Sequence, residues 1–186
     1  EAMVPAILIL TLAWTLKSMT DSLGAAAYVS DVVSSSASHL QMLLPAIIFV
    51  VAALLAFATG TSWGTFGILI PICVAVFPAA APLRVISISA CMAGAVCGDH
   101  ISPISDTTIM ASAGASCKHV HHVSSQLPYA LTVATVSFFT FIVAGFAQSL
   151  GFVAGIAVSW TTGLLLLGAA LCFLKKHRRP TAQKSA

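Results

Sequence analysis

Long apolar runs separated by short polar segments make up most of the chain. Runs without any charged residue lie at residues 42–58, 66–83, 127–147 and 152–174. An α-helix rises about 1.5 Å per residue, so about 20 apolar residues cross the roughly 30 Å hydrocarbon core of a bilayer. The pattern therefore predicts an all-α polytopic membrane protein with about five to six transmembrane elements.

The first apolar run is too short to cross a membrane by itself. It covers residues 3–16 and stops at Lys17, where the polar segment KSMTDSLG begins. We expect an interrupted first helix whose polar part is buried against other helices. Lys17 and Asp21 are four residues apart, so they can neutralise one another on one helix face.

A cluster of Gly, Ser and Thr joins the next two runs. These runs form either two complete spans or a re-entrant hairpin with residues 59–65 at its tip. We favour the hairpin, because protein or a water-filled cavity can cover non-helical backbone at membrane depth. Small residues can instead serve helix packing, and Trp63 can be an interfacial aromatic residue instead of a lid. The candidate tip or substrate-contacting residues are Thr59, Gly60, Thr61, Ser62, Trp63 and Gly64.

Another interruption lies in the segment GDHISPISDTT. The apolar run at residues 85–98 ends at Asp99, and apolar sequence resumes after Asp106. Pro103 cannot donate a backbone hydrogen bond, and it disfavours the helical conformation of the residue before it. The segment therefore predicts a broken transmembrane helix made of two half-helices.

The composition supports the membrane assignment and adds an orientation. Hydrophobic residues make up 59% of the chain and charged residues 7%, and the mean hydropathy is +1.02, which excludes a soluble globular domain. The surplus of the +3 net charge lies in a basic tail, and basic residues beside a span mark the cytoplasmic side. We predict a transmembrane half-transporter at residues 1–175 in the lipid bilayer, a cytoplasmic tail at 176–186, and no nucleic-acid binding. Counting back makes the turn at 148–151 external and the loop at 118–126 cytoplasmic.

Two carboxylates are the strongest candidates for chemistry. Asp99 and Asp106 are the only acidic residues after Asp31, and both fall within the predicted break. Carboxylates at membrane depth are costly and usually mark ion pathways, although Asp106 could instead cap the second half-helix. Neighbouring hydroxyl oxygens suit a small hard cation, so sodium and protons could compete for one carboxylate without a cofactor or another metal. The predicted ion-binding or proton-carrying residues are Asp99, Asp106, Ser102, Ser105, Thr107 and Thr108.

The histidines offer weaker signals. His100 adjoins Asp99 and is either a proton relay or a hydrogen-bonded structural residue. His119, His121 and His122 resemble a metal site in composition, but a zinc site needs a complete ligand set. We interpret these three histidines as part of a solvated connector.

Four segments together resemble the C-terminal half of NhaC-type sodium/proton antiporters. They are TLAW at 11–14, FATGTSWGTFGILIPI at 57–72, CGDHISPISDTTIMAS at 97–112 and HVSSQLPYAL at 122–131. The resemblance implies a secondary active antiporter of the cytoplasmic membrane that exchanges sodium for protons, with no enzymatic activity. It also implies two inverted repeats, each with a re-entrant hairpin and a broken helix near the midplane. On this basis the chain is one repeat, and its partner is a missing N-terminal repeat that precedes Glu1.

Other functions remain open at this point. One is a sodium- or proton-coupled exchanger of small organic anions or amines, of the malate/lactate type, in which the tip contacts the solute. Another is an intramembrane hydrolase, which is disfavoured because Asp99 and Asp106 share one helix break. A third is a half-size subunit, which would need a homodimer to form both walls of a transport site.

Overall fold

The computed structural model describes residues 38–177, together with Thr11, Thr15, Ser18, Met19 and residues 22–24. All regular structure in this part of the chain is helical, which confirms the predicted all-α fold class. Most of the predicted interrupted first helix, the Lys17–Asp21 pair and most of the basic tail fall outside the described residues. The elements are α3 (Ser38–Thr59), α4 (Ser62–Val76), α5 (Pro82–Ile101), α6 (Asp106–Gly114), α7 (His119–Ala147), the 3₁₀ turn η1 (Gln148–Leu150) and α8 (Phe152–His177).

Several of the helices are long and apolar enough to cross a membrane. These candidate spans lie in α3, in α7 together with η1, and in α8. The pair α5 and α6 makes a fourth candidate if the two are counted as one bent span. α4 has 15 residues and is therefore about 22 Å long, shorter than the roughly 30 Å hydrocarbon core. The chain is a polytopic membrane protein by these lengths and compositions.

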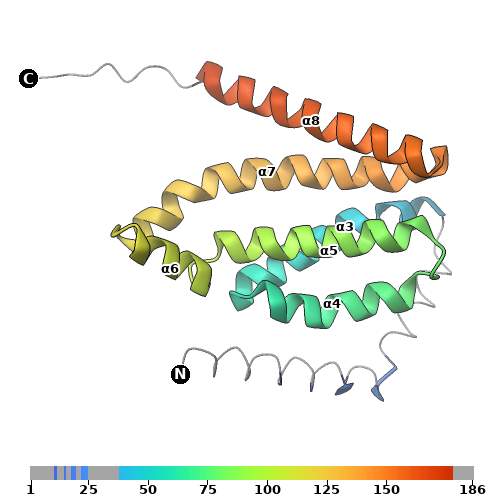
Figure 1. Cartoon of the computed structure of the whole chain (residues 1–186), viewed down its shortest axis with the longest axis horizontal. Coiled ribbons are helices and arrows are strands. Elements are labelled where there is room, and N and C mark those ends of the chain that lie inside the picture. Colours follow the sequence, from blue (N-terminus) through green and yellow to red (C-terminus); the bar gives the residue numbers. More distant parts are fainter. Residues whose placement is uncertain (1–10, 12–14, 16–17, 20–21, 25–37, 178–186) are drawn as a thin grey trace, which may run out of the picture.

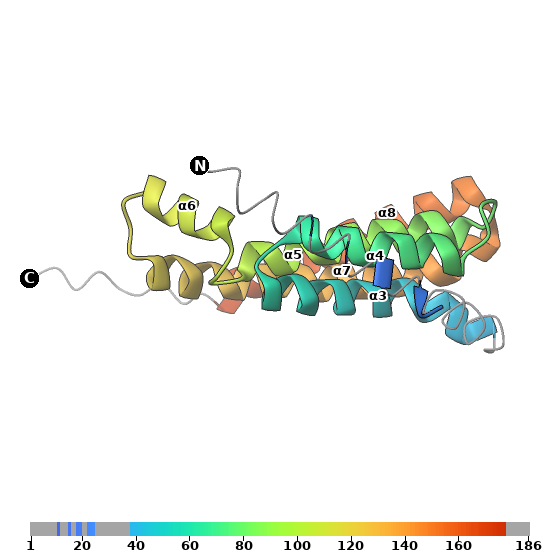
Figure 2. The ribbon, with the colours of Figure 1, turned by 90° about the horizontal axis from the view of Figure 1, so that it is seen from below.

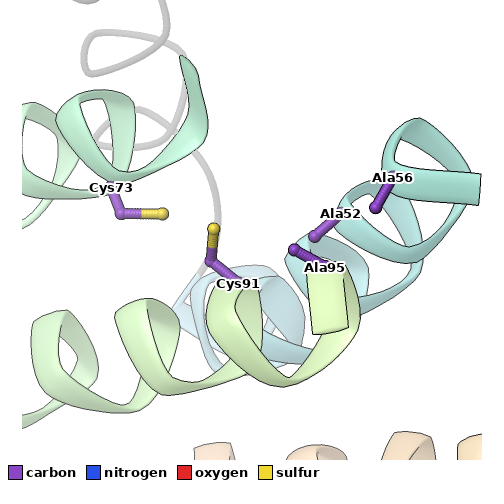
Figure 3. Close-up of a cluster of buried hydrophobic side chains, with 5 residues drawn as sticks. All are labelled: Ala52, Ala56, Cys73, Cys91 and Ala95. Carbon is purple, nitrogen blue, oxygen red and sulfur yellow. The ribbon is translucent and has the colours of Figure 1, made fainter. Parts of the chain in front are cut away.

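Close packing of α3 against α5 forms the centre of the fold. Gly94 and Gly98 are four residues apart on α5, and a side chain at either would collide with an α3 carbonyl oxygen, that of Phe49 or Ala53 respectively. Glycines at this spacing let two helix backbones approach closely in a membrane. The core next to them is also made of small side chains, shown in Figure 3: Ala52, Ala56, Cys73, Cys91 and Ala95.

α3 and α4 form an antiparallel hairpin, as Figure 1 shows. Gly60 makes the turn with a φ of 68°, a left-handed conformation that glycine adopts without a steric penalty. Thr61 follows in extended conformation, and its side chain accepts a hydrogen bond from the Gly64 N–H at 3.4 Å. The non-helical tip predicted for residues 59–65 is therefore too long: only Gly60 and Thr61 lie outside the helices, because Thr61 caps α4 and the next residues form its first turn.

The prediction of a loop at residues 118–126 is wrong for most of that segment, which is helical. α7 begins at His119 and continues without interruption to Ala147. The polar residues of this segment contain no helix breaker before Pro128, so polarity alone did not mark a loop. The actual connection between α6 and α7 is shorter, and it contains Ser116 in a left-handed conformation with a φ of 52°. The turn predicted at 148–151 is present as η1 followed by Gly151, whose φ is 95°.

The helices differ in how much of their surface the chain itself covers. α8 contacts α7 and η1, and the most apolar stretch of its candidate span has no buried residue. α6 lies at one end of the molecule, beyond the ends of α4 and α5, as Figures 1 and 2 show together. The α3–α4 turn and the α5–α6 connection consequently lie at the same end of the fold.

Candidate functional site

The α5–α6 connection is the predicted helix break. α5 ends at Ile101, α6 begins at Asp106, and the two helix axes are bent by 48°. Ser102 and Ser105 are both extended, with ψ angles of 128° and 134°. Pro103 accounts for the break, because its ring disfavours helical backbone at Ser102.

The two carboxylates do not lie within the break, which corrects the prediction from the sequence. Asp99 is in the last turn of α5, and Asp106 is the first residue of α6. The proline excludes helix only over the residues next to it, so both half-helices extend further into the polar segment than hydropathy indicates. Their environments also differ: the Asp99 side chain is 8% exposed, whereas Asp106 is exposed.

A chain of hydroxyl groups ends at the Asp99 carboxylate. Ser105 Oγ donates to Asp99 Oδ1 at 2.7 Å, and Ser105 Oγ lies 2.7 Å from Thr107 Oγ1. A serine hydroxyl has one proton, so Thr107 is the donor to Ser105 when Ser105 donates to Asp99. The arrangement joins the end of α5 to the start of α6 through side chains. Asp106 is not part of this chain of hydrogen bonds.

Neither Asp106 nor Ser105 caps the N-terminus of α6 through its side chain. Ser105 occupies the position before α6, but its side chain makes no capping hydrogen bond, because it is bonded to Asp99. Asp106 is within the first helical turn, where a negative charge interacts favourably with the helix dipole. Asp106 is therefore a first-turn acid and not the cap residue itself.

Ser102 and Thr108 hold the break against the rest of the fold. Ser102 is fully buried, and its Oγ donates to the carbonyl oxygen of Phe57 at the end of α3 at 2.8 Å. Thr108 Oγ1 donates to the carbonyl oxygen of His100 at 3.1 Å. This bond connects the first turn of α6 to the last turn of α5. The predicted neutral residues of the break are thus divided: Ser105 and Thr107 extend toward Asp99, while Ser102 and Thr108 bond to backbone.

The hairpin turn and the break are in contact. A Cβ atom at Gly60 would lie 3.0 Å from the carbonyl oxygen of Ile104, so only glycine fits there without displacement. The two motifs, more than forty residues apart in sequence, therefore lie next to each other in the fold. The hydroxyls of Thr59 and Thr65 are bonded to carbonyl oxygens one helical turn before them. Trp63 is 71% exposed and contacts the Phe66 ring, so it does not cover the break.

His100 lies beside a cavity between α5 and α7. Its backbone carbonyl accepts hydrogen bonds from Thr108 Oγ1 and from Gln126 Nε2. The cavity has a volume of about 590 Å³, and most of its lining is apolar. The lining residues that carry polar groups are His100, Gln126, Tyr129 and Ser137, together with Cys97.

His119 is a structural residue of the break that the sequence analysis assigned to a solvated connector. Its Nε2 lies 2.7 Å from the carbonyl oxygen of Pro103, and since a carbonyl only accepts, Nε2 is the donor. Its Nδ1 lies 3.1 Å from Ser112 Oγ on α6. His119 therefore ties the start of α7 to both the break and α6. No sequence signal connects it to Pro103, because the contact spans sixteen residues without a shared helical periodicity.

The chain resembles known proteins over most of its length. The sequence profile of the Na⁺/H⁺ antiporter family matches residues 1–146. An uncharacterised protein of Haemophilus influenzae is 51% identical over 150 residues, which is 80% of this chain and 28% of that protein. The malate-2H⁺/Na⁺-lactate antiporter of Bacillus subtilis is 32% identical over 98 residues, covering 52% of this chain and 21% of the relative. The arginine/ornithine antiporter ArcD of Halobacterium salinarum is 32% identical over 116 residues, covering 60% and 24%.

These relatives are all much longer than the matched region. The chain spans between 21% and 28% of their lengths. No solved structure matches the chain significantly. The family and the named relatives point to transport, and not to the intramembrane hydrolase considered from sequence. On the profile match over residues 1–146, the chain belongs to the Na⁺/H⁺ antiporter family.

Proposed function

We propose that the chain forms one side of the ion site of a secondary antiporter that exchanges sodium for protons across the cytoplasmic membrane. The observation that carries the proposal is the buried Asp99 carboxylate, hydrogen-bonded to Ser105 at a helix break that contacts the hairpin turn. A carboxylate at membrane depth is costly to keep without a partner, and both a proton and a cation can neutralise it. Sodium and protons are then the transported species, and no cofactor takes part.

The oxygen atoms near Asp99 suit sodium as its alternative partner. Hard cations prefer carboxylate, hydroxyl and carbonyl oxygens, and the Ser105 and Thr107 hydroxyls are in the same hydrogen-bonded chain as the carboxylate. When sodium binds at Asp99, the Ser105 hydroxyl can turn its proton away and offer a lone pair instead. When sodium leaves, a proton on the carboxylate restores neutrality. Because Asp99 binds either sodium or a proton but not both, movement of one ion in one direction is coupled to movement of the other in the opposite direction.

The remaining predicted residues have supporting or separate roles in this proposal. Ser102 and Thr108 keep the break in place through their backbone bonds. Asp106 is exposed at the start of α6, where it is accessible to a second repeat of the same protein or to a second copy of the chain. His100 is available as a proton relay at the edge of the cavity between α5 and α7. We propose the N-terminal repeat as the partner that completes the site, and a homodimer as a further arrangement.

Substitution of the buried carboxylate tests the proposal. In the full-length protein reconstituted in proteoliposomes, Asp99→Asn should abolish sodium-dependent proton flux. The amide is neutral, so it neither binds and releases a proton nor balances the charge of a sodium ion. Asp106→Asn should reduce the flux less, since that side chain is exposed. Purification yield and melting temperature control for folding. Undiminished exchange in a folded Asp99→Asn variant would contradict the proposal.

A second function is favoured by the cavity between α5 and α7. Its volume of about 590 Å³ is within the range of small-molecule pockets, and it adjoins His100 in the last turn of α5. Two relatives are a malate-2H⁺/Na⁺-lactate antiporter and an arginine/ornithine antiporter. A sodium- or proton-coupled exchanger of small organic anions or amines would use Asp99 for the coupling ion alone. Uptake of labelled malate, lactate or arginine into proteoliposomes driven by a sodium gradient separates this function from simple ion exchange.

A further inference from the structure

Two buried cysteines face one another between α4 and α5. Cys73 on α4 is 3% exposed and Cys91 on α5 is fully buried, and neither is in a disulfide. Figure 3 shows the two sulfur atoms pointing toward each other across the helix interface. Both side chains belong to one buried cluster, so the two thiols lie next to each other.

The ion site does not account for this pair. Cys91 is eight residues before Asp99 on α5, or about 12 Å along the helix. The side chains that complete the cluster are three alanines, Ala52, Ala56 and Ala95, so the pair lies in an apolar environment. Buried thiols in apolar surroundings are usually inert as single residues. Two adjacent thiols behave differently from a single one, because the second thiol can react with the oxidised form of the first to give a disulfide.

We propose that Cys73 and Cys91 form a redox-sensitive modification site, at which a small uncharged peroxide converts the two thiols to a disulfide that joins α4 to α5. One sulfur attacks a peroxide oxygen, the O–O bond breaks, and the products are a sulfenic acid and water when hydrogen peroxide is the oxidant. The second sulfur then displaces the hydroxyl group of the sulfenic acid as water, and the S–S bond forms. The thiols lose two electrons and two protons, and hydrogen peroxide is reduced to two molecules of water.

The surroundings explain both the oxidant and the reactivity. A charged oxidant cannot enter an apolar helix interface without losing its hydration, whereas hydrogen peroxide is small and neutral. The thiolate is the nucleophile in the first step, and an adjacent thiol can stabilise it by donating a hydrogen bond. Cys97 on the same helix lacks these conditions, because it lines the cavity between α5 and α7.

The disulfide would join α4, the second arm of the hairpin, covalently to α5. α3 is already held to α5 by close approach at Gly94 and Gly98. Cys73 of α4 and Cys91 of α5 belong to the buried cluster between these two helices. A covalent bond there would prevent α4 from separating from α5. The bond would form whichever ion or solute the protein moves.

The experiment uses the full-length protein in native membranes. A site-specific protease sequence is inserted in the connection between α4 and α5, at residues 78–81, and every cysteine except Cys73 and Cys91 is replaced by serine. Membranes are treated with hydrogen peroxide, blocked with a thiol reagent, and cleaved. We expect the two fragments to run as one band on a non-reducing gel and to separate completely after reduction.

A matched variant distinguishes this pair from random oxidation. Cys91→Ser with Cys97 retained keeps two cysteines on the same two helices, and it should lose the joined band entirely. Intact-mass measurement on the uncleaved protein should show a loss of two hydrogen atoms in the Cys73/Cys91 protein. Separation of the fragments without reductant, or gain of oxygen at the cysteines in place of hydrogen loss, would overturn the proposal.

Discussion

At the scale of single residues, side chains of the same type on either side of the break lie in different environments. Asp99 and Asp106 are both acids in one polar segment, yet only Asp99 is buried and bonded to a hydroxyl. Buried serines also differ: Ser105 bonds to Asp99, whereas Ser87 Oγ on α5 has no hydrogen-bond partner. These differences allow the contribution of the carboxylate's environment to be measured with small substitutions.

Ser105→Ala is expected to weaken sodium binding without unfolding the protein. The substitution removes a hydroxyl that contacts the Asp99 carboxylate at 2.7 Å and is a candidate sodium ligand. A hydrogen bond to a charged group contributes about 1.5–3 kcal/mol, so the apparent sodium affinity should fall by about tenfold or more. The sodium concentration dependence of proton flux in proteoliposomes measures it.

Ser87→Ala is the matched control for this prediction. It removes a buried serine hydroxyl from α5 that bonds to nothing, so sodium affinity should stay unchanged and stability should not fall. Equal effects of Ser105→Ala and Ser87→Ala on sodium affinity would show that the Ser105 hydroxyl has no special relation to the ion.

The sequence was sufficient to identify most of these residues but not their contacts. Asp99, Ser105 and Thr107 stand out because polar groups are rare in apolar runs. The burial of one acid and the exposure of the other depend on which face of each half-helix meets the fold. His119 shows the limit clearly: its bond to Pro103 connects separate elements, and composition places it with two neighbouring histidines in a loop.

At the scale of elements, the break and the α3–α5 contact have opposite physical origins. The break comes from Pro103, a local restriction on backbone conformation that the sequence displays directly. The α3–α5 contact comes from the absence of side chains at Gly94 and Gly98, which matters only when another helix lies there. The break is therefore predictable from the sequence, whereas the close α3–α5 contact was not predicted, although the four-residue spacing of the glycines was a usable signal.

Gly98→Ala is expected to destabilise the protein. Its Cβ would overlap the Ala53 carbonyl oxygen, so α3 and α5 must move apart around the end that carries Asp99. Overpacking of this kind typically costs about 1–3 kcal/mol. The melting temperature of the full-length protein in detergent should therefore decrease.

Gly168→Ala on α8 is the control for Gly98→Ala. A Cβ at Gly168 meets no atom within 4 Å, and alanine is the better helix former, so the melting temperature should remain the same or rise. A Gly98→Ala protein as stable as the Gly168→Ala protein would mean that α3 and α5 are not in close contact.

At the scale of the whole molecule, much apolar surface is left for other contacts. The most apolar stretch of α8 has no buried residue, and the chain spans at most 28% of the relatives' lengths. A helix that is apolar on all sides is stable when lipid or other helices surround it. The lipid bilayer and a second repeat are the partners we propose for this surface.

The two ends of α7 should face opposite sides of the membrane, with the α6–α7 connection in the cytoplasm. Cys117 is exposed just before α7, and Ser149 lies in η1 just after it. In cells, a membrane-impermeant thiol reagent should label a Ser149→Cys protein but not Cys117. In inverted vesicles the pattern should reverse. Labelling of Cys117 from outside would reverse the topology inferred from the basic tail.

The sequence by itself determined the membrane environment, the helical fold class, the break at Pro103 and the turn at Gly151. These features follow from hydropathy, from backbone restriction at proline and from the conformational freedom of glycine, all of which act locally. Only the tertiary structure decided that Asp99 is buried, that Gly60 meets Ile104 and that Cys73 faces Cys91. Those relations depend on the rotation and approach of helices, which are fixed by packing between residues far apart in the chain.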